Sequence, residues 1–109
     1  MIKDLSQQEE AALLAVKKEI ARRYPLRWMK LFGSKVRGDA DAESDLDVAI
    51  AIESVNWEIE KSIYEICFYA GLEYDTLLSP VVYSGQELSQ SRTLATPFFR
   101  LLEKEGIQI

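Results

Sequence analysis

The segment from residue 45 to residue 52 alternates strictly between two kinds of side chain. Leucine, valine and isoleucine occupy every second position, namely Leu46, Val48, Ile50 and Ile52. Aspartate and alanine fill the positions between them, namely Asp45, Asp47, Ala49 and Ala51. Because successive side chains of a strand point to opposite faces, the pattern predicts a β-strand with a bulky face and a small face. The bulky face should pack on helices, and the small face carries both carboxylates with room above them.

Two segments with helical periodicity lie on either side of this strand. Ser6 and Glu9 have the spacing of a capping box, and the apolar residues that follow predict an amphipathic helix over residues 7–23. Residues 55–70 also follow a helical pattern, and Gly71 is expected to end that helix. Its two apolar stripes are Ile59-Ile63-Ile66-Ala70 and Trp57-Tyr64-Phe68. One stripe would cover a sheet, and the second is either a partner surface or is covered by the C-terminal helices.

The other elements complete a single small domain. They are expected as strands over residues 26–32 and 76–83, a short helix over 86–91, a helix over 96–102 and a small strand over 107–109. Pro80 cannot donate to a strand ladder, so the 76–83 strand should lie at an edge or contain a bulge. The element order predicts one α/β domain over residues 1–109, with a small mixed β-sheet flanked by helices.

The composition narrows the chemistry that such a domain can perform. The 109 residues have a formal net charge of −5, no histidine and one cysteine, Cys67. This acidic balance argues against a general attraction to nucleic acid or anionic lipid, and the usual zinc ligands are missing. No apolar run approaches the ~20 residues of a membrane span, and the N-terminus lacks an apolar leader. We therefore expect a cytoplasmic protein that binds any metal through oxygen.

The expected topology gathers polar residues at one edge of the sheet. Gly33 ends one strand and Asp45 begins the next, so antiparallel pairing should bring the Gly33-Ser34 turn beside both aspartates. A helical crossover would return the chain to a parallel third strand, with Asp75 near its start. Asp45 and Asp47 repel each other unless a cation lies between them, and Mg²⁺ prefers such oxygen ligands. Because a glycine turn lets backbone amides and the serine hydroxyl approach a phosphate, the residues indicate phosphoryl or nucleotidyl transfer.

Gly33-Ser34, ten intervening residues and Asp45-Leu46-Asp47 resemble the signature of the DNA polymerase β-type nucleotidyltransferase superfamily. The fuller motif, Gly-Ser-x-x-Arg-Gly followed by Ser-Asp-Leu-Asp, is most similar to the minimal nucleotidyltransferases. The resemblance implies a polymerase β-like nucleotidyltransferase fold. It also implies that Gly33 and Ser34 hold the nucleotide phosphates, while Asp45 and Asp47 coordinate two Mg²⁺ ions.

Two positions stay open within this resemblance. Active members of the superfamily usually carry a third carboxylate on a later strand. The pattern does not fix the strand parity, and that position falls here on Asp75 or instead on Leu77 or Ser79, neither of which is acidic. Arg37 either steadies phosphate charge or forms a loop-ordering ion pair with the acidic residues within 39–41.

The resemblance implies a Mg²⁺-dependent nucleotidyltransferase that moves a nucleoside monophosphate, with AMP from ATP favoured, to an acceptor hydroxyl. The acceptor would lie on a partner protein, which for minimal nucleotidyltransferases is often a HEPN-domain toxin, and the chain would then be its antitoxin. The alternative is a binding module that lacks the third carboxylate and neutralises its partner by contact through the second stripe. Nucleic acid is disfavoured as a substrate. The oligomeric state stays open, a homo-oligomer included.

Overall fold

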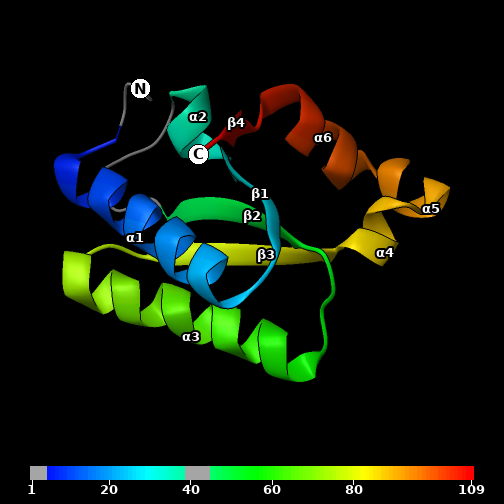
Figure 1. Cartoon of the computed structure of the whole chain (residues 1–109). Helices are drawn as coiled ribbons and strands as arrows, with labels where there is room; N and C mark the ends of the chain where they lie inside the picture. Colours follow the sequence, from blue (N-terminus) through cyan, green and yellow to red (C-terminus); the bar gives the residue numbers. More distant parts are fainter. Residues whose placement is uncertain (1–4, 39–44) are drawn as a thin grey trace.

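The computed structural model describes residues 5–38 and 45–109, which form a mixed sheet with helices on both faces (Figure 1). The strands of this part of the chain are β1 (Leu26–Phe32), β2 (Leu46–Ile52), β3 (Leu78–Ser84) and β4 (Ile107–Gln108). Its helices are α1 (Gln7–Arg23), α2 (Ser34–Arg37), α3 (Trp57–Tyr74), α4 (Gly85–Leu88), α5 (Ser91–Leu94) and α6 (Pro97–Glu105). The predicted α/β architecture is confirmed.

The sheet has the strand order β3-β2-β1-β4, which puts β2 at its centre and β3 at an edge. β1 pairs with β2 in antiparallel register, so that Phe32 lies opposite Asp47. β3 runs parallel to β2, with Ser79 opposite Asp47, and α3 makes the crossover between them. Both predicted strand directions are confirmed, and Pro80 lies in the edge strand, where its missing amide costs no ladder bond to a further strand.

The two faces of β2 have different coverings, as the alternation of its side chains predicts. The bulky face packs on α1 and α3 in the main core, in which the following residues are buried: Leu13, Val16, Ile20, Leu46, Val48, Ile50, Ile52, Ile63 and Cys67. On the small face, Ala49 packs with Tyr83 of β3 and with Phe99 and Leu102 of α6. Figure 1 shows α3 below the sheet and α6 above it. Because burying each large aliphatic side chain contributes about 1.5–3 kcal/mol, the α1–α3 face is the main source of stability.

Local sequence patterns predict the start of α1 correctly but not the end of α3. The Ser6–Glu9 capping box of α1 is confirmed in both of its hydrogen bonds. The prediction that Gly71 ends α3 is wrong, because this helix continues to Tyr74 and ends in Asp75 with φ 53°. Gly71 instead makes room for the returning chain, since a Cβ there would lie 2.7 Å from the Thr76 carbonyl oxygen.

Two further sequence expectations are resolved by the C-terminal region and the surface. The expected 86–91 helix is divided into α4 and α5, whereas α6 begins after the Thr96 cap and ends before Gly106, as expected. The second stripe of α3 is not covered by the C-terminal helices, since Trp57, Tyr64 and Phe68 are 70%, 41% and 61% exposed.

Among the residues that the structure places, no helix has the length and apolar character that a membrane crossing requires.

Candidate active site

The turn between β1 and α2 holds Gly33 against the carboxylate of Asp47. Gly33 has a φ of 85°, which L side chains rarely adopt, and a Cβ at this position would lie 2.3 Å from Asp47 Oδ2. Both the backbone conformation and the close approach therefore require glycine. The carbonyl of Gly33 accepts hydrogen bonds of 3.1 Å from the amides of Val36 and Arg37. This arrangement puts Ser34 at the start of α2, next to the glycine that contacts Asp47.

The two aspartates meet a serine from the neighbouring strand. Asp45 lies directly before β2 and Asp47 is the second residue of that strand. The Ser79 hydroxyl donates a hydrogen bond of 2.9 Å to Asp45 Oδ2, and Ser79 pairs with Asp47 in the strand register. Three oxygen-bearing side chains, from the start of β2, the residue before it and β3, therefore lie together at this end of the sheet.

The pKa of Asp47 is raised above the ordinary value of 3.8. Partial burial is the largest cause, and the negative charge of Asp45 adds to it. The positive charge of Arg37 acts in the opposite direction and offsets part of the shift. Ionisation of Asp47 is thus less favourable than that of an ordinary aspartate, and a bound cation would relieve the repulsion between the two carboxylates.

Gly33 and the four residues of α2 form what we call the signature turn. Arg37 lies at the end of α2 and links this turn to α6. Its guanidinium is 3.7 Å from Glu105 Oε2, and the side chains of Arg37 and Glu105 are 44% and 25% exposed. The effect of Arg37 on Asp47 shows that it lies close enough to the site to act on its charge. Its expected ion pair with the acidic residues within 39–41 lies outside the described residues.

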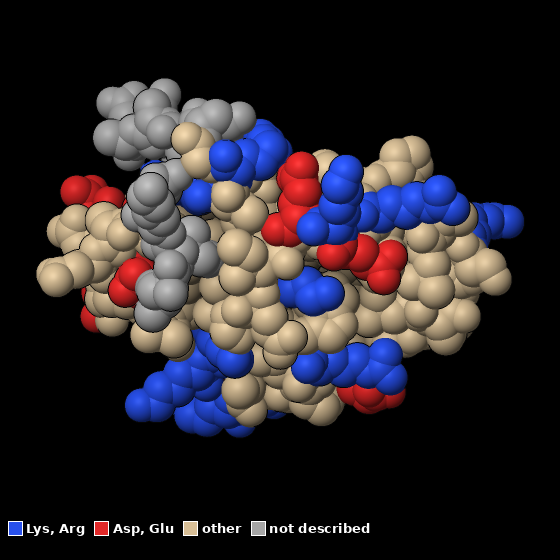
Figure 2. Space-filling model, turned by 90° about the horizontal axis from the view of Figure 1, so that it is seen from above, with Lys and Arg blue, Asp and Glu red and all other residues tan. Residues whose placement is uncertain are grey.

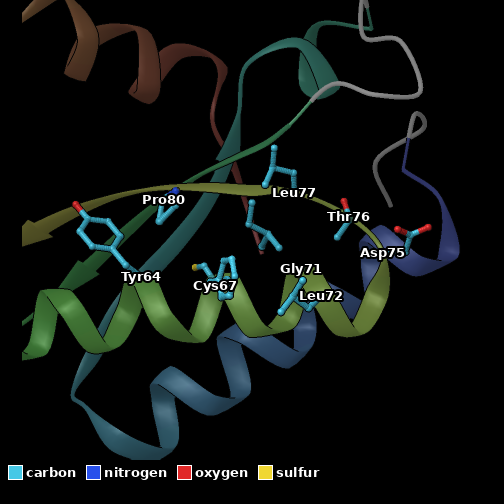
Figure 3. Close-up of a pocket in the computed structure, with 10 residues that line it drawn as sticks. Tyr64, Cys67, Gly71, Leu72, Asp75, Thr76, Leu77 and Pro80 are labelled. Carbon is cyan, nitrogen blue, oxygen red and sulfur yellow. The ribbon is translucent and has the colours of Figure 1, made fainter.

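The structure does not bring Asp75 to the two aspartates. Asp75 is exposed at the C-terminal end of α3, at the rim of a groove that Leu77 and Pro80 also line (Figure 3). Within residues 5–38 and 45–109, no group of three acidic, cysteine or histidine side chains is arranged to hold a metal ion. Asp75 caps α3 and precedes β3, which begins at Leu78, so the β3 residue that lies beside Asp45 on the small face is Ser79.

A buried ion pair behind the signature turn was missed by reasoning from the sequence. The Lys35 ammonium lies 2.9 Å from Glu9 Oε2, and the Lys35 side chain is only 4% exposed. Lys35 follows Ser34 in a segment rich in charged and small residues, where a lysine is ordinarily solvated. The capping box drew attention to Glu9 but carried no signal about its distant partner.

The chain is similar to known nucleotidyltransferases along most of its length. The family model described as "Nucleotidyltransferase domain" matches residues 13–95. MJ0141 of Methanocaldococcus jannaschii, which is named provisionally as a protein adenylyltransferase, is 38% identical over 80 residues, or 72% of this chain and 74% of that protein. Protein adenylyltransferase MntA of Thermococcus cleftensis is 41% identical over 46 residues, or 42% of this chain and 46% of that protein.

Two solved structures share the fold. One is the crystal structure of a toxin–antitoxin with AMP-PNP, which has a TM-score of 0.62 and 19% identity and covers 91% of this chain and 70% of the solved one. The other is a mutant form of the toxin–antitoxin MntA–HpeT, with a TM-score of 0.62, 17% identity and the same coverage. At these identities, the similarity shows the architecture alone.

Proposed function

Because the chain belongs to the nucleotidyltransferase domain family and is a nucleotidyltransferase, we propose that it moves AMP from ATP to a hydroxyl group on a partner protein. The observation that carries this proposal is the contact between the signature turn and the second aspartate, where a Gly33 Cβ would lie 2.3 Å from Asp47 Oδ2. A triphosphate held by Gly33 and Ser34 would therefore lie directly beside the two carboxylates. The names of the two relatives support adenylyl as the transferred group.

The residues at the site fit Mg²⁺ in their chemistry. Asp45, Asp47 and Ser79 offer only oxygen atoms, which this cation prefers, and burial together with the negative charge of Asp45 raises the pKa of Asp47. When bound, Mg²⁺ would neutralise charge on the triphosphate and favour ionisation of the acceptor hydroxyl. Asp45 and Asp47 would be the residues that hold it. The number of ions, two by the family resemblance, stays a prediction.

The chain's own residues would orient the nucleotide for displacement at its α-phosphorus. Gly33 leaves space for the phosphates, Ser34 donates a hydrogen bond to them, and Arg37 contributes positive charge from the end of α2. The acceptor oxygen forms a bond to the α-phosphorus while the bond from that phosphorus to the pyrophosphate oxygen breaks. Pyrophosphate leaves, and the proton of the acceptor hydroxyl passes to water.

The acceptor would arrive on another protein, and we place this pair in the cytoplasm, where ATP is available. The two solved neighbours are toxin–antitoxin structures, which supports an antitoxin role and a toxin as the partner. We predict that this toxin has a HEPN domain. The exposed stripe of α3 is the surface we assign to the contact, and α3 also carries Glu58, Glu60, Glu65 and Glu73. A partner with an apolar and basic surface would complement it.

Neutralisation by contact alone is the second candidate function. Ser79 favours it, because this serine occupies the place beside Asp47 where a third carboxylate would strengthen metal binding. In that case the exposed stripe of α3 would carry the function and the nucleotide site would contribute little.

The face seen from above in Figure 2 has basic groups set apart from one another, with acidic side chains among them. It therefore offers a partner mixed charge and not one continuous basic surface.

The decisive experiment incubates the protein with Mg²⁺, ATP labelled at the α-phosphate and the protein encoded beside it. We expect label on the partner with the wild-type chain and none with the Asp45→Asn/Asp47→Asn double variant. Glu53→Gln is the matched control, since Glu53 is a carboxylate that follows the other end of β2.

The outcomes separate the two candidate functions. Equal labelling by the double variant and the wild type would contradict the catalytic assignment. A double variant that transfers no label but still suppresses the toxicity of the partner would establish neutralisation by contact. Loss of both labelling and suppression would show that the modification itself neutralises the partner.

A further inference from the structure

The signature turn is tied to the first helix by a buried ion pair. Lys35 lies between Ser34 and Val36 in α2, and its side chain passes inward until the ammonium is 2.9 Å from Glu9 Oε2. The two side chains are only 4% and 11% exposed. Removing charges from water is unfavourable unless they are paired in good geometry, so each of these side chains depends on the other.

Glu9 is held on both of its carboxylate oxygens. Its Oε1 atom accepts a hydrogen bond of 2.9 Å from the Ser6 amide, while Oε2 meets Lys35. The Glu9 amide donates a bond of 3.1 Å to the Ser6 hydroxyl, which completes the capping box. α1 is itself fixed to the core, because Leu13 and Val16 are buried there. The ion pair therefore connects the turn to a rigid helix and not to another loop.

The turn is thereby held from several directions at once. Gly33 contacts Asp47 on the sheet, and Arg37 pairs with Glu105 on α6 across 3.7 Å. Lys35 supplies the buried contact, which faces away from solvent, whereas Arg37 is 44% exposed. A turn built on a four-residue helix has little structure of its own, so these tertiary contacts must determine where its amides lie.

We propose that Lys35 and Glu9 are positioning residues, whose ion pair holds Gly33 and Ser34 against Asp47 and so sets the affinity of the site for a triphosphate. The inference rests on the proposed function of the Gly33–Asp47 site. It assigns no contact with the nucleotide to Lys35 or Glu9. Both act through the placement of the turn.

The test compares single and paired neutral substitutions. Lys35→Met leaves a buried carboxylate with less compensation, and Glu9→Gln leaves a buried ammonium in the same position, so both should lower the melting temperature. The Glu9→Gln/Lys35→Met double variant removes both charges and keeps a side-chain oxygen for the capping box. Its melting temperature should return toward the wild-type value.

Affinity for ATP with Mg²⁺, measured by calorimetry, should not return with the melting temperature. We expect the double variant to bind about tenfold more weakly than the wild type, because a turn displaced by a fraction of an ångström no longer meets the phosphates. The single variant Lys35→Arg keeps the positive charge opposite Glu9, so its affinity should lie between those of the double variant and the wild type. Lys61→Met, at an exposed lysine of α3, is the matched control and should bind as the wild type does. A double variant with wild-type affinity would overturn the proposal.

A second measurement needs no nucleotide. Amide hydrogen exchange of the double variant should be faster by about tenfold at Val36 and Arg37, whose amides bond to the Gly33 carbonyl, with core strands unchanged. Unchanged exchange in this turn would also overturn the proposal. If the wild type binds ATP and the variants behave as expected but no label reaches a partner, the proposed transfer fails while the positioning role stands.

Discussion

The two ends of β2 are built from similar parts but treat their carboxylates differently. At the start of the strand, Gly33 contacts the Asp47 side chain. After its end, Gly85 contacts the backbone of Glu53, since a Cβ on Gly85 would lie 2.8 Å from the Glu53 carbonyl oxygen. That oxygen accepts a hydrogen bond of 3.1 Å from the Gly85 amide. Gly33 thus lies against a carboxylate. Gly85 instead joins the start of α4 to the residue after β2 by a backbone hydrogen bond, which we call the Gly85 joint.

The charges at the two ends explain which end can bind a ligand. The Glu53 carboxylate is already paired with Arg27 at 2.7 Å, and both side chains are open to solvent. Asp47 is half-buried beside Asp45, and both burial and that neighbouring charge raise its pKa. Perturbed carboxylates of this kind are concentrated at ligand-binding sites, so the comparison supports our proposal that the site lies at the Asp47 end.

The first comparison neutralises one carboxylate at each end of β2, and the largest expected effect is at Asp47. Asp47→Asn should lower label transfer about 10³-fold, or about 4 kcal/mol of transition-state stabilisation, because the metal loses a ligand. The same variant should be more stable than the wild type near neutral pH, since it no longer buries a charge or places that charge beside Asp45. Glu53→Gln should leave transfer unchanged. A stabilised Asp47→Asn protein with full activity would break the comparison.

Alanine at each glycine should separate the two kinds of contact. Gly33→Ala strains a backbone with φ 85° and displaces the Asp47 carboxylate, so we expect about 10²-fold slower transfer. Gly85→Ala should lower the free energy of unfolding while the transfer rate per folded molecule stays the same. Labelling kinetics and urea denaturation measure the two quantities, and equal losses of activity would contradict our reading of Gly33.

A third carboxylate placed beside Asp47 should sharpen the difference between the ends. Ser79→Asp should raise Mg²⁺ affinity by about tenfold and lower stability in the absence of metal. Ser79→Ala should cost about 0.5–1.5 kcal/mol through the lost bond to Asp45. Asp75→Asn is the matched control and should alter affinity little, because Asp75 lies at the groove of α3. A strong loss of Mg²⁺ binding in Asp75→Asn would restore the sequence-based assignment of that residue.

The dependence of stability on pH should have opposite signs for Asp47 and Glu9. The folded-state pKa of Asp47 is raised above 3.8, so its contribution to stability declines as the pH rises through that raised value. For Glu9, burial opposes ionisation, but bonds from Ser6 and Lys35 outweigh it and lower the pKa below 4.5. Its contribution is present above 4.5 and is lost as the pH falls through the lowered value. Urea denaturation of Asp47→Asn and Glu9→Gln from about pH 3 to about pH 7 checks both signs.

The smallest effect is expected at the satisfied end. Arg27→Gln should change the free energy of unfolding by less than about 1 kcal/mol, because an exposed ion pair is screened by water and salt. Added salt should reduce even this difference. A loss of several kcal/mol would mean that the Gly85 joint depends on the Arg27–Glu53 pair, which its exposure does not suggest.

Local sequence patterns predicted the parts of the fold that local physics determines. The alternation in β2 revealed both of its faces, and the Ser6–Glu9 spacing revealed the start of α1. The placement of Gly33 beside the aspartates followed from strand direction, since adjacent antiparallel strands bring the end of one to the start of the next.

The remaining features depend on contacts between distant segments. Gly71 lies inside α3 and leaves room for the Thr76 carbonyl oxygen, a close approach that only the folded chain creates. The position of Ser79 beside Asp47 depends on where β3 begins after the αL residue Asp75, and a shift of one residue would reverse its face. The Lys35–Glu9 pair joins two helices that no short motif connects.

The buried thiol of Cys67 can report how often α3 separates from β3. Cys67 is the only cysteine in the sequence and is 1% exposed where α3 faces β3. Burial raises its pKa to about 12, and the thiolate is the form that alkylating reagents attack. Reagents in solution should therefore reach it only while α3 is separated from the edge strand. The rate of alkylation counts these openings in the unmodified chain, without a dye or a substitution.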